Sequence, residues 1–98
     1  MIWSCEINYS GWEDDIHHHH FFIESDTKPT KEEVIQHYNW HHFDAEDWGH
    51  NWLRKASPKE KWRSDTGIVA LDEKGRIEYV DVYISIKPLK VEKLDDSK

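Results

Sequence analysis

The sequence predicts one α+β domain with a four-stranded antiparallel sheet, in the order β-β-α-(α)-β-β, and one or two helices packed on one face. Three observations predict it. Apolar and polar residues alternate near both ends of the chain, which is the period of a strand. A helix-start motif lies between these regions. The 98 residues include 13% aromatic ones, enough for one modest core. We expect the domain to span residues 1–90, followed by a charged, frayed tail at 91–98.

The first two strands are predicted to form a hairpin. Residues 1–9 alternate, with Cys5, Ile7 and Tyr9 on one face. Residues 16–24 alternate in the same way across a short polar connection. One face of this second strand carries His17, His19, Phe21 and Ile23, and the other carries His18, His20, Phe22 and Glu24.

A helix is predicted from about residue 31 to residue 43. Thr30 and Glu33 have the spacing of a capping box. Trp40 and Phe43 fall outside the apolar stripe, so they either pack on the next segment or form an exposed aromatic contact. A second, short helix is predicted at about 45–55, with Asp44 as its N-cap.

The C-terminal part is predicted to form two more strands, at 67–71 and 76–86. Gly75 can take the left-handed conformation that closes the turn between them. On the longer strand Val80, Val82, Ile84 and Ile86 share one face, which we assign to the core.

Composition limits the classes of function. The net charge is −7, and residues 1–50 carry eleven Asp or Glu against two Lys or Arg. That balance argues against a general nucleic-acid binder. One cysteine allows no internal disulfide, and the first ten residues lack the basic and apolar regions of a signal peptide. We expect a cytoplasmic protein without a membrane segment.

Eight histidines raise the possibility of a metal site. His37 and His41 lie four residues apart on the predicted helix, and His19 lies on the inward face of the second strand. These three side chains could bind zinc or a similar metal, and so support a metal-binding protein or a small metal-dependent enzyme. The competing interpretation is that the histidines pack at the edge of the core, since the HExxH and Cys/His finger motifs are absent.

The stretch 52–63 interleaves tryptophans with Lys and Arg. Such a pattern can bind single-stranded nucleic acid by base stacking and phosphate pairing. The competing interpretation is a solvated loop whose tryptophans face inward.

We interpret the chain as a non-enzymatic protein-binding module whose partner presents a basic surface. Catalytic motifs are absent, and the lone Cys5 is expected to be a buried structural residue. The expected contact residues are Trp40, Phe43, Glu46 and Asp47. In its small size, acidity and aromatic content the chain resembles inhibitor proteins encoded by bacteriophages, anti-CRISPR proteins among them. That resemblance implies an inhibitor that occupies a nucleic-acid-binding surface, with carboxylates where phosphates would lie.

Overall fold

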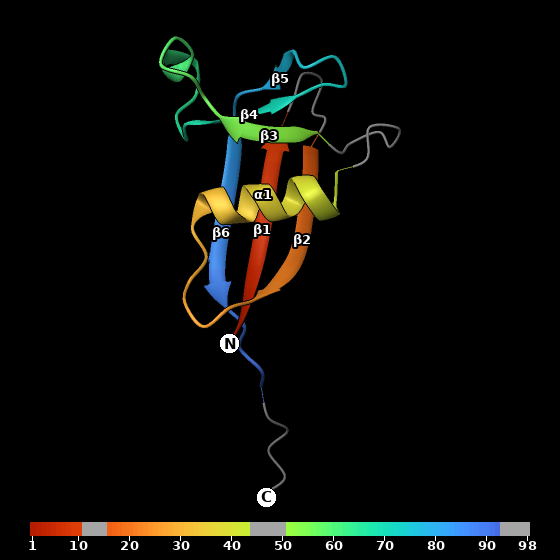
Figure 1. Cartoon of the computed structure of the whole chain (residues 1–98), viewed down its shortest axis with the longest axis vertical. Coiled ribbons are helices and arrows are strands. Elements are labelled where there is room, and N and C mark those ends of the chain that lie inside the picture. Colours follow the sequence, from red (N-terminus) through yellow and green to blue (C-terminus); the bar gives the residue numbers. More distant parts are fainter. Residues whose placement is uncertain (11–15, 44–50, 93–98) are drawn as a thin grey trace, which may run out of the picture.

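Two antiparallel sheets and one α-helix form the described part of the chain, residues 1–10, 16–43 and 51–92, in a computed structural model (Figure 1). Each sheet has three strands. The α+β class is therefore confirmed, but the single four-stranded sheet is wrong. No described helix is long and apolar enough to cross a membrane.

The larger sheet contains the predicted hairpin. Strand β1 (Ile2–Ser10) is central, with β2 (Ile16–Glu24) on one side and β6 (Val82–Pro88) on the other. The hairpin register runs from Ile2 opposite Glu24 to Ser10 opposite Ile16. Alternation works as expected, because Cys5, Ile7 and Tyr9 are buried while their neighbours on β1 lie on the open face.

Helix α1 (Lys31–His41) crosses the inner face of this sheet (Figure 1). The capping box is confirmed: the Thr30 hydroxyl accepts from the Glu33 amide at 3.1 Å, and the Glu33 carboxylate accepts from the Thr30 amide at 3.0 Å. The helix ends two residues before the predicted end. Val34, Ile35 and Tyr38 are its buried apolar residues.

The smaller sheet corrects the second helix. Residues 52–55, predicted as the end of that helix, form strand β3 (Trp52–Lys55), which pairs with β4 (Ile68–Leu71). Residues 45–50 lie outside the described residues. This segment forms a strand because its backbone pairs with β4 on one edge. On the other edge, the side chain of Asn39 bonds the backbone of Leu53. A short 3₁₀ helix, η2 (Lys61–Arg63), lies between β3 and β4.

The predicted long strand at 76–86 is divided between the two sheets. Strand β5 (Ile77–Tyr79) pairs with β4, whereas β6 pairs with β1. Tyr79 and Val82 are both buried but lie three positions apart. One continuous strand would place them on opposite faces, so the chain breaks between them. The turn before β5 is as predicted, with Gly75 at φ 80°.

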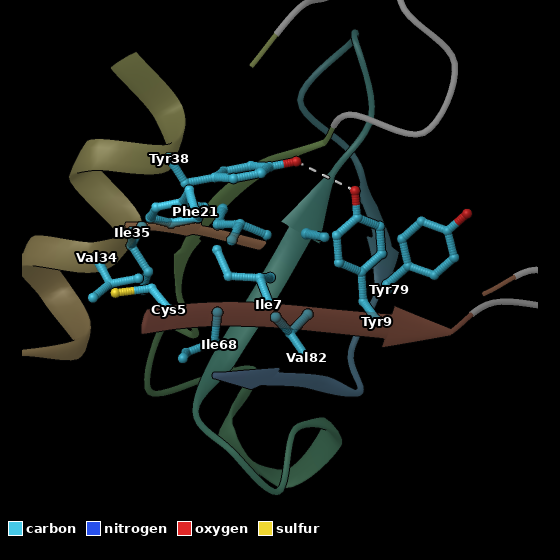
Figure 2. Close-up of a cluster of buried hydrophobic side chains, with 12 residues drawn as sticks. Cys5, Ile7, Tyr9, Phe21, Val34, Ile35, Tyr38, Ile68, Tyr79 and Val82 are labelled. Carbon is cyan, nitrogen blue, oxygen red and sulfur yellow. Dashed lines mark hydrogen bonds between the residues drawn. The ribbon is translucent and has the colours of Figure 1, made fainter. Parts of the chain in front are cut away.

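The core lies where the larger sheet, α1 and the smaller sheet meet (Figure 2). Side chains from all six strands and α1 converge there, and Figure 2 shows Tyr9 and Tyr38 reaching toward each other from opposite sides. At the C-terminal end, the amide of Leu89 donates to the Ile2 carbonyl at 2.9 Å. Val91 and Glu92 are exposed, and the rest of the predicted tail lies outside the described residues.

Candidate functional site

A groove of about 360 Å³ runs between the outer side of α1 and the end of β2. The loop after β2 closes one side of it. Its lining residues are Ile23, Glu24, Ser25, Pro29, Glu33, Gln36, His37, Trp40 and His41. The lining therefore contains two carboxylates, two imidazoles and one indole, and no Lys or Arg. This composition suits a cationic ligand.

Trp40 is the largest exposed side chain of the groove, with 74% of its surface accessible. It lies in the last turn of α1, on the side away from the buried Val34 and Tyr38. Of the two interpretations of Trp40, packing on the next segment and an exposed contact, the described residues support exposure. A large indole left in water at the edge of a groove is a feature typical of interaction sites.

The imidazoles of His37 and His41 line the groove, and the ring of His42 lies beside that of His37. The ring of His37 lies 4.5 Å from that of His41 and 5.6 Å from that of His42, centroid to centroid. Phe21, from β2, stacks on His37 at 5.2 Å and on His42 at 4.6 Å. Burial lowers the pKa of His37, and the charges that His41 and His42 would carry lower it further. The neutral form of the His37 imidazole is therefore favoured.

His19 does not join His37 and His41. Its Nε2 lies 3.1 Å from the Tyr9 hydroxyl and 3.4 Å from the Tyr38 hydroxyl, at the edge of the core. Within the described ranges, no group of three or more His, Cys, Asp or Glu side chains is placed to hold a metal ion. His37 and His41 are thus neighbours, as their spacing predicts, but His19 belongs to a different cluster.

That buried cluster links the two sheets through α1. The Tyr9 and Tyr38 hydroxyls lie 3.4 Å apart, and both are 3.3 Å from the Asn51 amide nitrogen. Burial raises the pKa of both tyrosines, so they remain protonated donors and acceptors. The cluster satisfies polar groups in the core, and we assign it a structural role.

The other expected contact residues have different outcomes. Phe43 is half-buried and packs edge-on against Trp52, with ring centroids 5.3 Å apart. It therefore contributes to packing against β3, and its role as a partner contact stays a prediction. Glu46 and Asp47 lie outside the described residues. Glu24, an acidic residue of the groove, was not predicted as a contact.

The buried state predicted for Cys5 is confirmed, since none of its surface is exposed. Burial raises the pKa of the thiol, which disfavours the thiolate that a nucleophile requires.

The open face of the larger sheet holds a Ser–His pair that sequence reasoning missed. The Ser4 hydroxyl lies 2.6 Å from Nε2 of His20, and Glu6 lies 3.8 Å from His18 on the same face. Backbone amides of the central strand β1 are committed to pairing with β2 and β6. They are not free to stabilise an oxyanion, so the pair does not form a hydrolase site with them.

The basic stretch also differs from one expectation. Trp62 is 82% exposed and Trp52 is 38% exposed. The interpretation that the tryptophans of residues 52–63 face inward is therefore wrong for Trp62, whereas Trp52 packs in part against Phe43. Neighbouring cations could have indicated the exposure of Trp62, because it lies directly between Lys61 and Arg63 in the sequence.

Comparisons with protein-family models, with curated proteins and with solved structures found no match.

Proposed function

We propose that the protein is a binding module that holds a basic segment of a partner protein in the groove between α1 and β2. The exposed indole of Trp40, on a groove lined by two carboxylates and no Lys or Arg, is the observation that supports this function. Exposed tryptophans beside a pocket are frequent centres of binding energy at protein interfaces.

The chemistry of the groove favours an arginine or lysine side chain. Its aliphatic stem can lie along Trp40, and a cation over an indole is attracted by the ring. The carboxylates of Glu24 and Glu33 can then pair with the charged head. Glu33 already accepts from the Thr30 amide, which fixes its position before a ligand arrives.

The partner class follows from charge. A chain of net charge −7 approaches a basic surface with a favourable long-range field. Proteins that process nucleic acids carry such surfaces to hold phosphates. The module would compete with nucleic acid for that surface and so act as an inhibitor.

A titration monitored by NMR tests the proposal. The ¹⁵N-labelled protein receives an arginine-rich peptide, with a glutamate-rich peptide of equal length as the control ligand. We expect shifts at the Trp40 indole and at His37 and His41 with the basic peptide alone. Shifts confined to other surfaces would contradict the groove as the binding site.

Two variants sharpen the test. Trp40→Ala should weaken binding about 10-fold or more, the effect of losing an interface contact worth at least about 1.4 kcal/mol. Glu24→Gln should weaken it and reduce its salt dependence. Tyr83→Ala is the matched control, since Tyr83 is an aromatic residue that is 54% exposed on the open sheet face. Equal affinity for Trp40→Ala and Tyr83→Ala would rule the proposal out.

A further inference from the structure

A basic projection, separate from the groove proposed to bind a basic segment, lies between β3 and β4. It spans residues 57–66 and includes η2. In Figure 1 this segment, drawn in green, extends beyond the smaller sheet. None of its residues lines the groove beside Trp40. We refer to it as the basic finger.

Internal ion pairs leave the finger with unbalanced positive charge. Arg54 makes two bonds to the Glu60 carboxylate, at 2.8 and 3.0 Å, and these bonds with the Ser57 amide lower the pKa of Glu60 to about 2. Lys55 pairs in turn with Glu32 of α1. Arg54 of β3 therefore neutralises Glu60. The other acid of the finger, Asp65, is exposed and balances one of the remaining cations in net charge. Lys59, Lys61 and Arg63 remain exposed.

The indole of Trp62 stands among these cations. It is 82% exposed, the largest exposed fraction of any large apolar side chain in the described part of the chain. The Arg63 guanidinium lies 5.8 Å from the centre of the indole ring. One flat aromatic surface and three cations are thus presented together.

The finger is held in place before any ligand binds. Glu60 accepts from the Ser57 amide at 2.8 Å, and the Ser64 hydroxyl donates to the Ile68 carbonyl at 2.9 Å. The Ala56 amide donates to the Gly67 carbonyl at 2.8 Å, which closes its base. A fixed geometry reduces the entropy lost on binding. Such bracing of an exposed indole is consistent with a contact surface.

We infer that the basic finger is a contact site for single-stranded nucleic acid, with a base stacked on Trp62 and phosphates paired with Lys59, Lys61 and Arg63. Stacking selects a single strand, because the faces of bases inside a duplex are covered by their neighbours. A peptide made of acidic residues alone would use the cations but would have no planar group for the indole.

The three phosphate contacts set the salt dependence of this binding. Three phosphate contacts predict that the logarithm of affinity falls with the logarithm of salt with a slope of about −2, or about 100-fold for a tenfold rise in salt. We therefore expect measurable binding at low salt and much weaker binding at high salt.

Fluorescence anisotropy with a labelled oligothymidine, measured on the whole chain at low salt, tests the inference. Trp62→Ala should weaken binding about 5- to 150-fold, the range for loss of one base–aromatic stack. Trp40→Ala is the matched aromatic control and should leave the affinity unchanged, so the result is separable from the groove proposal. Equal effects of the two variants would overturn the inference.

Charge is tested with two double variants of equal net charge. Lys59→Glu with Lys61→Glu should abolish binding. Lys87→Glu with Lys90→Glu, at exposed positions in and after β6, should retain it. Equal loss in both would mean that only the bulk field acts. Binding of polyglutamate that equals that of the oligothymidine and does not change in Trp62→Ala would show an anion contact without base stacking, and would also overturn the inference.

Discussion

The side-chain amide of Asn39, on α1, makes both hydrogen bonds of the Leu53 backbone in β3. Its Nδ2 donates to the Leu53 carbonyl at 2.8 Å, and its Oδ1 accepts from the Leu53 amide at 2.9 Å. Asn39 is itself buried, at 9% exposed. The amide therefore replaces the neighbouring strand that β3 lacks on this edge, and ties the smaller sheet to the helix.

Asn39→Ala should lower the free energy of unfolding by about 2–5 kcal/mol, because it leaves a buried amide and a buried carbonyl without partners. Chemical denaturation measures this change. Gln36→Ala, an exposed position on the same helix, is the control and should change stability by under about 0.5 kcal/mol. Similar values for the two variants would mean that the hydrogen bonds between Asn39 and Leu53 do not stabilise the attachment of the smaller sheet to α1.

Tyr9 and Tyr38 should show strong coupling. Their hydroxyls share the Asn51 amide and the His19 ring, so either one can partly replace the other. We expect Tyr9→Phe and Tyr38→Phe each to cost about 1 kcal/mol. The double variant should cost more than their sum by about 0.5–3 kcal/mol. A double-mutant cycle in denaturant measures the coupling, and simple additivity would contradict the shared arrangement.

His37 should make stability depend on pH. Its pKa is lowered in the folded protein, so the unfolded chain takes up the proton at higher pH. The stability that neutral His37 contributes is complete above the unfolded pKa of about 6.5, and is lost as pH falls toward the lower folded value.

His37→Gln should therefore flatten the fall in melting temperature between about pH 7 and pH 5. His18→Gln, on the open face of the sheet, is the control. The groups around His37 are Phe21, His41 and His42, together with the groove carboxylates of Glu24 and Glu33. If His37→Gln kept the wild-type pH profile, the packed imidazoles would not govern acid stability.

Zinc should bind weakly if at all through His37 and His41, since His19 is committed to the tyrosine cluster. Calorimetric titration of chelator-treated protein, with a melting curve, measures this. We expect no rise in melting temperature with zinc. A one-to-one submicromolar site that raises the melting temperature, and that His37→Ala with His41→Ala removes, would restore the metal-binding alternative.

Local signals in the sequence predicted the elements that depend on local chemistry. The hairpin followed from alternation on both strands, and the start of α1 from the Thr30–Glu33 box. Strand β3 could not be predicted in this way, because its stability depends on Asn39, fourteen residues before Leu53, and on pairing with β4. The break between Tyr79 and Val82 likewise depends on which side each sheet presents to the core.

The candidate site was predicted only in part. The helical period correctly separated Trp40 from the buried stripe, and it placed His37 beside His41. It could not show that the end of β2 approaches this side of the helix and supplies Glu24, since that proximity is tertiary. The sequence also did not show that Arg54 pairs with Glu60. It therefore could not tell which cations of the basic stretch are paired with an acid and which are exposed.

Selection from a random peptide display library tests the central claim most directly, because it assumes no partner. The immobilised protein is the target, and Trp40→Ala is used for counter-selection. We predict that the enriched peptides are rich in Arg or Lys and bind Trp40→Ala about 10-fold or more weakly than the wild type. Enriched peptides that are acidic, or that bind the wild type and Trp40→Ala equally well, would contradict a groove built to hold a basic segment.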